Sequence, residues 1–301
     1  MDYKKIIKNK KTRIRILEGF DFIPDTWMVK AQYRIKTGRR LNLKNPRRFT
    51  EKIQWYKLFY RDSRMQRCAN KVSAREYVEE CGLEEILTTL FGVYSSAEEI
   101  DFEKLPDQYV IKDSLGAGGN EVIIVEDNSR IDVPALRKKL CGWVTRPIPK
   151  KHIGREWVYA GQEHRILIEE LLLPPKGQKD LVEYKLFCFN GKVEYAYIIS
   201  ERKLGESAAL AIIDADFKRI PAQRKDERPL LPEIEKPNNW NELVKIAEKL
   251  SIPFPQVRVD LYDIDGRIVF GEFTFFDGSG YMKFEPDEFD YMLGEKWTIG
   301  N

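Results

Sequence analysis

Short runs of apolar residues, alternating or continuous, predict that much of the chain forms β-strands. Two pairs of runs flank tight turns and are typical of β-hairpins, one turn at Asn190-Gly191 and the other at 263–266. A third pair flanks a glycine-rich loop. The predicted strands are 109–111, 122–125, 165–172, 181–189, 192–199, 208–213, 217–220 and the two halves of 257–276.

Apolar residues at helical spacing predict helices between these strands, and residues 1–66 are expected to be mainly helical. Thr50 is the expected N-cap of one helix. Ser73 and Glu76 form a capping box, so a second helix is predicted to begin there, with Lys71 just before it. Further helices are predicted at 133–144 and about 241–250.

Composition places the chain among globular proteins. Its 301 residues can bury one large core or two smaller ones, and 43% of them are hydrophobic. The net charge of +3 gives no support for nucleic-acid binding. The apolar runs are too short for a membrane span or a signal peptide, so a cytoplasmic location is expected.

Cysteine and histidine usage excludes several kinds of site. The four cysteines have no CxxC spacing, which argues against a zinc site or a disulfide framework. Only His152 and His164 are present, which argues against a histidine-ligated metal and a Ser-His-Asp triad. The basic cluster at 4–11 is typical of a solvated helix face, with peripheral association to an anionic membrane as the alternative.

The glycine-rich hairpin loop is the first candidate for chemistry. Lys112 ends the first strand of this hairpin, and Gly116, Gly118 and Gly119 follow in the loop. Glycines let backbone N–H groups approach an anion, and a lysine adds a positive charge, so phosphate binding is one interpretation. A merely flexible hairpin is the other. The loop differs from a Walker A loop, because a strand and not a helix comes next.

The last predicted hairpin carries the second candidate. Arg258 and Asp260 share one face of its first strand, and Glu272 and Thr274 share one face of its second. Two carboxylates and a hydroxyl are oxygen ligands suited to magnesium, which is commonly held by one or two carboxylates together with substrate phosphates. A solvated hairpin with Arg258 paired to a carboxylate is the alternative interpretation.

Taken in order, these features resemble the ATP-grasp superfamily, and specifically its TupA-like branch of teichuronopeptide and capsular polysaccharide biosynthesis. The resemblance covers nearly the whole chain and implies an α+β fold, in which two α+β subdomains grip ATP. The helical N-terminal region expected from the sequence is a departure, because many members of the superfamily begin with a Rossmann-like α/β domain. The resemblance implies boundaries at 1–66, 67–172 and 173–301. The motifs that carry it are IPDTW, NLKNPRRFTEKIQWYKLF, LPDQYVIKDSLGAGGN, EYKLFCFNGKV and VRVDLYDIDGRIVFGEFTFFDGSG.

The resemblance also implies roles for single residues. Lys71 and Lys112 match lysines that contact the nucleotide phosphates, and Glu183 matches the residue that binds the ribose hydroxyls. The loop that closes over the phosphates matches Gly116, Ala117, Gly118, Gly119 and Asn120. The segment that holds adenine, largely through its backbone, matches Glu169, Glu170, Leu171 and Leu172.

The implied metal ligands are Asp260 and Glu272, and the third ligand position carries Thr274 where the superfamily usually has Asn. Arg258 matches the arginine that steadies the acyl phosphate, so Arg258 and Lys112 are the expected catalytic residues. A smaller departure is Asn70, where an acidic residue usually precedes the first lysine.

The implied activity is that of an ATP- and Mg²⁺-dependent carboxylate–amine ligase that works through an acyl phosphate. The implied carboxylate belongs to a uronic or sugar-linked acid, and the implied amine to an amino acid or amino sugar. A small-molecule kinase, a non-catalytic nucleotide-binding protein and a glycosyltransferase are the alternatives. For the last, Asp214-Ala215-Asp216 fits the letters of a DxD motif, although a turn at the strand end explains it equally well.

Overall fold

The computed structural model describes residues 19–299 except 117, 118, 120, 149, 202–207 and 232. The predictions for Ala117, Gly118, Asn120 and the basic cluster at 4–11 therefore lie outside the described residues. Within them, no helix is both long enough and apolar enough to cross a bilayer.

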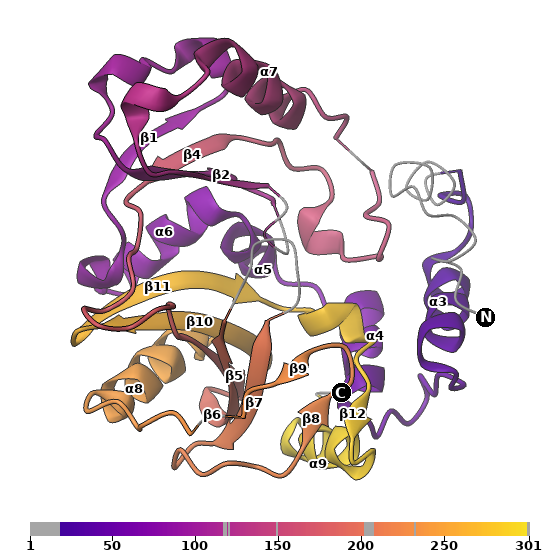
Figure 1. The fold of residues 1–301 in the computed structure, drawn as a ribbon. Coiled ribbons are helices and arrows are strands. Elements are labelled where there is room, and N and C mark those ends of the chain that lie inside the picture. Colours follow the sequence, from indigo (N-terminus) through magenta and orange to yellow (C-terminus); the bar gives the residue numbers. More distant parts are fainter. Residues whose placement is uncertain are drawn as a thin grey trace.

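Two β-sheets form the framework of the molecule (Figure 1). The first sheet is antiparallel, with strand order β1 (Leu90–Tyr94), β4 (Ile166–Glu169), β2 (Tyr109–Asp113) and β3 (Val122–Val125). The second has the order β11 (Arg267–Thr274), β10 (Gln256–Ile264), β5 (Glu183–Phe189), β6 (Lys192–Ser200), β7 (Ala209–Asp214) and β9 (Arg228–Pro229). It is antiparallel except where β9 pairs with β7. A small third sheet joins β12 (Phe284–Glu285) to β8 (Gln223–Arg224).

Helices pack on both sheets. The α-helices are α3 (Asp25–Thr37), α4 (Phe49–Phe59), α5 (Ser63–Ala69), α6 (Lys71–Glu80), α7 (Val133–Val144), α8 (Trp240–Ser251) and α9 (Glu288–Lys296). Two of them, α5 and α6, lie between the sheets (Figure 1). Short 3₁₀ turns are η1 (Glu84–Ile86), η2 (Ala97–Glu99), η3 (Phe102–Lys104), η4 (Asn128–Arg130), η5 (Trp157–Tyr159) and η6 (Asp277–Gly280). The prediction of an α+β fold is thus confirmed.

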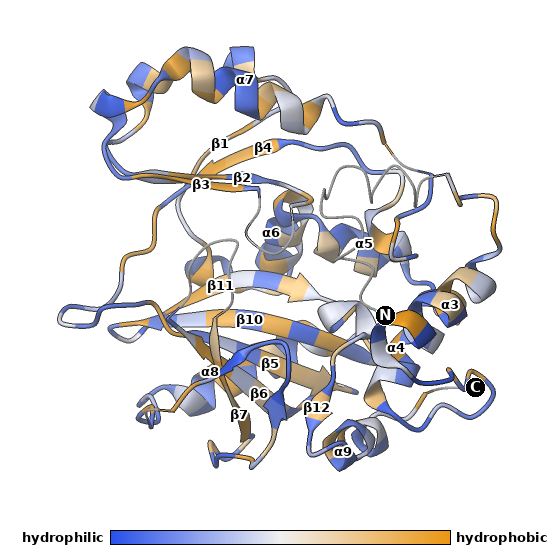
Figure 2. Ribbon diagram, turned by 45° about the vertical axis from the view of Figure 1, so that its right-hand side comes forward, coloured by the Kyte–Doolittle hydropathy of each residue, from blue (hydrophilic) through white to orange (hydrophobic). Residues whose placement is uncertain are grey.

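Each sheet has its own hydrophobic core. On the first sheet, Leu140 and Trp143 of α7 pack against apolar strand residues such as Ile111 and Ile168. Figure 2 shows these strands coloured hydrophobic beneath α7. On the second sheet, the buried face of α8 packs against β5, β6 and β10. The larger core also includes Phe49 of α4, so the N-terminal helical region packs into the body of the second sheet.

Several predicted elements match the structure closely. The hairpin around the glycine-rich loop, the helix at 133–144 and the hairpin with its turn at 263–266 are confirmed. The predicted strand at 217–220 is wrong, since only an isolated bridge joins Ile213 to Arg219. Phe217 has a positive φ of 69°, which turns the chain instead of extending it.

Both predicted helix caps are wrong. Helix α4 begins at Phe49, and the Thr50 hydroxyl donates instead to Asp290 at 2.8 Å. Helix α6 begins at Lys71 because the side chain of Asn70 caps it, accepting a hydrogen bond from the amide of Val72. Asn is as good an N-cap as Ser, and it comes first in the chain. Lys71 therefore occupies the first turn of a helix.

Candidate active site

A cavity of about 830 Å³ lies between the two sheets. Residues from β2, β3 and the glycine-rich loop form one wall, and residues from β5, β6, β10 and β11 form the other. The predicted site residues in its walls are Lys71, Lys112, Gly116, Gly119, Glu170, Leu171, Leu172, Glu183, Arg258, Glu272 and Thr274. Glu169 and Asp260 do not line the cavity but contact residues that do.

A row of polar side chains crosses the second sheet beneath the cavity. Strand pairing places Tyr197, Lys185, Asp260 and Glu272 opposite one another on β6, β5, β10 and β11. Side chains at directly opposed positions point to the same face of a sheet. The sequence pattern grouped Asp260 with Glu272 but assigned Lys185 no role. Lys185 is in fact 6% exposed.

The Asp260 carboxylate is completely buried and lies between two cations. Arg258 donates to both of its oxygens at 2.7 Å, and Lys185 donates to Oδ2. Burial by itself disfavours the charged form, but Arg258 and Lys185 reverse this effect and lower the pKa of Asp260 below its usual value. Lys185 also donates to Glu183 Oε1 at 2.8 Å, so it connects the predicted ribose ligand with a predicted metal ligand.

Arg258 connects β10 to the η6 turn. Its guanidinium donates to Asp277 as well as to Asp260, and it lies 3.5 Å from Glu272 Oε1. Burial opposes its charge, yet the surrounding carboxylates raise the pKa of Arg258 well above its usual value. Asp277 also lies 3.4 Å from Arg224 of β8, a cavity residue that the sequence pattern did not single out.

Lys71 links the glycine-rich loop to the second sheet. Its ammonium donates to the Gly116 carbonyl at 2.5 Å and lies 3.6 Å from Glu272 Oε2. Its backbone N–H donates to the Ser114 carbonyl at 2.9 Å. Burial tends to raise the pKa of Glu272, but Lys71 is the largest of the opposing effects, and the pKa of Glu272 lies below its usual value.

Lys112 points from β2 toward the end of β4, where it donates a hydrogen bond to the buried Glu169. The second Glu169 oxygen accepts from Thr88 at 2.6 Å and from Arg75 at 3.2 Å. Burial raises the pKa of Glu169, yet these partners, Lys112 first, lower it below its usual value. The side chain of Glu169 thus fixes Lys112, a function that the match to an adenine-binding segment did not indicate.

The segment after β4 connects the two sheets. Glu170 forms a paired ion contact with Arg267 of β11, at 2.6 and 2.9 Å. Its backbone N–H donates to the Thr89 carbonyl at 2.9 Å. Leu171 and Leu172 continue along the cavity wall. Glu170, Leu171 and Leu172 therefore line the cavity where the chain crosses from one sheet to the other.

The opposite end of the cavity contains a polar cluster that the sequence analysis missed. Glu156, just before η5, accepts a hydrogen bond from the hydroxyl of Ser279 in η6. Lys57 of α4 donates to Ser279 Oγ at 2.9 Å and to the Ser279 carbonyl at 2.7 Å. Burial is the main cause that lowers the pKa of Lys57 to about 8. Burial also lowers the pKa of the neighbouring His152.

Tyr159 lines the cavity together with Glu156, Glu272 and Arg258. Burial raises the pKa of its hydroxyl above the usual value, and the carboxylates of Glu156 and Glu272 add to the shift.

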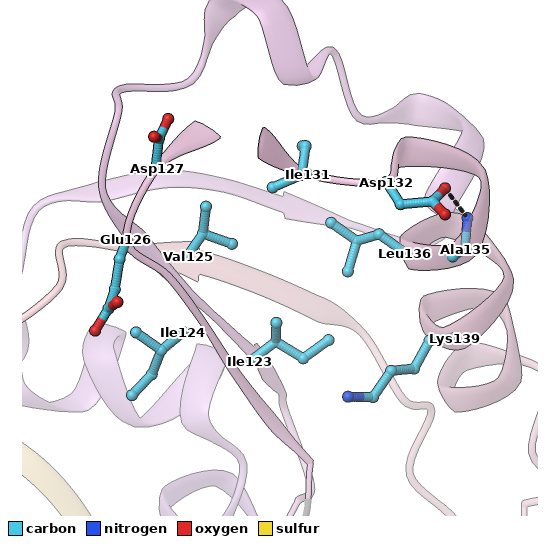
Figure 3. Close-up of a pocket in the computed structure, with 10 residues that line it drawn as sticks. All are labelled: Ile123, Ile124, Val125, Glu126, Asp127, Ile131, Asp132, Ala135, Leu136 and Lys139. Atoms are coloured by element: carbon cyan, nitrogen blue, oxygen red, sulfur yellow. Dashed lines mark hydrogen bonds between the residues drawn. The ribbon is translucent and has the colours of Figure 1, made fainter. Parts of the chain in front are cut away.

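A smaller hollow of about 350 Å³ lies elsewhere, between β3 and α7 (Figure 3). Its wall is mainly apolar, with Ile123, Val125 and Leu136 pointing into it. Asp132 caps α7 by accepting a hydrogen bond from the Ala135 amide at 3.0 Å. None of the predicted site residues that the structure describes lies in this hollow.

The model of the TupA-like ATP-grasp family matches residues 51–298, which is most of the chain. The chain belongs to the TupA-like ATP-grasp family. This assignment confirms the resemblance found in the sequence, and it shows that the two sheets and their cavity are those of an ATP-grasp protein. A comparison with curated proteins found no match.

Among solved structures, 155 chains match. They include D-alanine–D-alanine ligase from Bacillus anthracis, at 19% identity and a TM-score of 0.43, covering 69% of this chain and 56% of that one. L-amino acid ligase from Bacillus licheniformis matches at 15% identity and a TM-score of 0.44, with coverages of 71% and 42%. The chain thus spans about half the length of these proteins, and the family assignment rests on the family model alone.

Proposed function

We propose that this TupA-like ATP-grasp chain is an ATP-dependent carboxylate–amine ligase. In the proposed reaction, a carboxylate attacks the γ-phosphate of ATP to give an acyl phosphate, and an amine then displaces phosphate to form an amide. The proposed substrates are a sugar acid and an amino acid or amino sugar in cell-surface polysaccharide biosynthesis, handled in the cytoplasm. The division into 1–66, 67–172 and 173–301 is part of the proposal.

The observation that carries this proposal is the contact between Lys71 and Glu272 in the cavity wall. It brings a lysine that also holds the glycine-rich loop to within 3.6 Å of a carboxylate on the second sheet. Triphosphates need cations and backbone N–H groups, while their magnesium ions need oxygen ligands. The cavity offers both on facing walls.

Nucleotide binding is assigned to residues of both walls. We propose that Lys71, Lys112, Gly116 and Gly119 contact the phosphates, together with Ala117, Gly118 and Asn120 outside the described residues. Adenine would lie against the backbone of 169–172, and the ribose hydroxyls would bond to Glu183. The Lys112–Glu169 pair supports this, because a lysine that is already held in place loses less side-chain entropy when a phosphate binds.

Magnesium is assigned to Glu272, Thr274 and Asp260. Among the described residues, no three His, Cys, Asp or Glu side chains form a ready-made metal cage. Glu272 and Thr274 line the cavity and fit magnesium, which usually takes one or two protein carboxylates and completes its shell with phosphate oxygens and water. Both oxygens of the buried Asp260 bond to Arg258 or Lys185, so Asp260 would bind the ion only in exchange for one of these partners. When bound, it would supply charge neutralisation at the transferring phosphoryl group. Arg258, held by Asp260 and Asp277, would stabilise the acyl phosphate.

One observation disfavours the glycosyltransferase alternative. Asp214 Oδ1 accepts hydrogen bonds from the amides of Asp216 and Lys218, at 3.0 and 2.8 Å. The DxD letters are therefore explained by a turn at the end of β7, and neither aspartate is among the residues that line the cavity.

Thermal-shift titration with ATP and magnesium tests the proposal. Wild type should be stabilised by about 2.7 kcal/mol at 100 times the dissociation constant. Asp260→Ala and chelation of magnesium should each weaken the shift, whereas Asp216→Ala, on an exposed turn, should not. Stabilisation by UDP-sugars alone would favour the glycosyltransferase, and no response to ATP would refute nucleotide binding.

A further inference from the structure

Glu156 is a buried carboxylate in the cavity wall, at the end away from the adenine segment. It is 8% exposed, and segments distant in the sequence hold it: Ser279 from η6 and Lys57 from α4. Lys57 is 1% exposed and is not part of the cavity wall, so Glu156 and Ser279 are the members of this cluster that a ligand can reach.

Hydrogen-bond chemistry fixes the orientation of this cluster. A lysine ammonium can only donate, so Ser279 Oγ must accept the hydrogen bond from Lys57. A serine hydroxyl has a single hydrogen, which Ser279 therefore gives to Glu156 Oε1. The described part of the chain places no hydrogen-bond donor on Glu156 Oε2. One carboxylate oxygen is thus anchored, and the other is left for a ligand.

The backbone is shaped to let this cluster form. Ser279 has φ 58°, a left-handed conformation that a residue with a side chain adopts at some cost. A Cβ at Gly154 would lie 3.0 Å from Glu156 Oε1 and 3.1 Å from Ser279 Oγ. Glycine at 154 therefore leaves the space in which the carboxylate and the hydroxyl meet.

One turn ties this carboxylate to the reacting end of the cavity. Within η6, Asp277 bonds to Arg258, and Ser279 bonds to Glu156 two residues later. The cation proposed to steady an acyl phosphate and the half-anchored carboxylate are thus held by the first and third residues of a four-residue turn. An acid substrate would be attracted by Arg258 and repelled by Glu156, whereas an ammonium group would be attracted by Glu156.

We propose that Glu156 binds the ammonium group of the amine substrate and accepts the proton that this group must lose before it attacks. This inference rests on the proposed ligase function. The ammonium gives one proton to Glu156 Oε2, and the neutral nitrogen attacks the acyl carbon. The new C–N bond forms as the C–O bond to phosphate breaks. The nitrogen loses its second proton to the departing phosphate or to water, and Glu156 returns its own proton to solvent.

The assignment of Glu156 can be tested by separating the two halves of the reaction. Hydroxylamine is largely uncharged at neutral pH and traps an acyl phosphate as a hydroxamate without a base. Wild type is first screened for ATP-dependent hydroxamate formation with a panel of uronic acids. Amide formation is then measured for each active acid with the common amino acids and amino sugars. Glu156→Gln keeps the acceptor for Ser279 and removes the charge, while the exposed Glu163→Gln is the matched control.

The expected result is that Glu156→Gln forms hydroxamate at nearly the wild-type rate but forms amide about 100-fold more slowly. Amide formation by Glu156→Gln within twofold of the wild-type rate would overturn the inference. An equal loss of hydroxamate formation and amide formation would also overturn it, because Glu156 would then act in the activation of the acid. Wild type that forms no hydroxamate with any acid would refute the ligase function itself.

Discussion

Lys185 stands opposite Asp260 on the neighbouring strand, and its ammonium donates a hydrogen bond to the aspartate carboxylate. Asp260 is fully buried and also bonds to Arg258, so its charge is balanced by two cations within the protein. Removing one partner of a buried ion pair is costly, because the other charge stays buried with less compensation. Lys185 is therefore expected to matter for stability as well as for the cavity.

Lys185→Met should lower the free energy of unfolding by about 3 kcal/mol, the low end for a broken buried pair, because Arg258 still holds Asp260. Urea denaturation measures this. Lys192→Met is the matched control: Lys192 is exposed on the next strand and pairs with Glu248, and its loss should cost less than about 0.5 kcal/mol. Equal effects of the two variants would show that the Lys185–Asp260 pair contributes nothing.

Glu169→Gln should weaken ATP binding about tenfold, which corresponds to about 1.4 kcal/mol. The glutamine oxygen can still accept from Lys112, but without the negative charge the lysine is held on β4 less firmly and loses more rotamer freedom when the nucleotide binds. Calorimetric titration with ATP and magnesium measures the change. Glu126→Gln, exposed on the same sheet, should bind ATP like wild type. Unchanged or tighter binding by Glu169→Gln would contradict this function of Glu169.

Gly294→Ala should destabilise the protein by about 3 kcal/mol. A Cβ at Gly294 of α9 would overlap the carbonyl oxygen of Arg47 and lie 2.9 Å from the amide of Phe49, at the start of α4. Gly142→Ala, in the last turn of α7 with open space around it, should instead stabilise by about 0.5 kcal/mol through helix propensity. Thermal unfolding of both variants checks this contrast. A lower stability of Gly142→Ala than of wild type would contradict it.

Lys57 should make stability rise with pH. Its pKa is about 8 in the folded protein against an ordinary value of 10.5, because burial disfavours the charged form. Unfolding therefore takes up a proton between these two pH values, and stability rises as the pH increases through this window. The free energy of unfolding of wild type, relative to that of Lys57→Met, should therefore rise by about 3 kcal/mol across this pH window. Urea denaturation of both proteins at several pH values measures this difference. The contributions of titratable groups that the two proteins share cancel in it. A constant difference would contradict the shifted pKa.

Local sequence patterns predicted the elements whose structure is decided locally. Helix α7 and the second strand of the hairpin around the glycine-rich loop have the predicted limits, and the first strand is two residues longer, because alternation and helical spacing are properties of neighbouring residues. The cap of α6 failed for a related reason. Two adequate capping residues, Asn70 and Ser73, compete within one turn, and the sequence alone does not rank them.

The sequence predicted cavity residues only where a motif marked them. Lys185 gave a usable sign, since it lies two positions after Glu183 and must share its face, but burial of that face depends on the opposite sheet. Glu156 and Ser279 gave none, because 123 positions separate them and the turn that joins them has no regular pattern. Long-range polar contacts of this kind are specified by the fold as a whole.

The contact of Lys57 with Ser279 also bears on how the chain could be recombined with its relatives. Helix α4 precedes the segments proposed to bind the nucleotide, yet it supplies a buried lysine to the turn that holds Arg258. A chimera that exchanged the first 66 residues would leave the Ser279 hydroxyl without its donor and the Glu156 carboxylate without its anchored orientation. The N-terminal helices and the C-terminal turn must therefore be inherited together, and selectivity for the acceptor should follow the pair and not either segment alone.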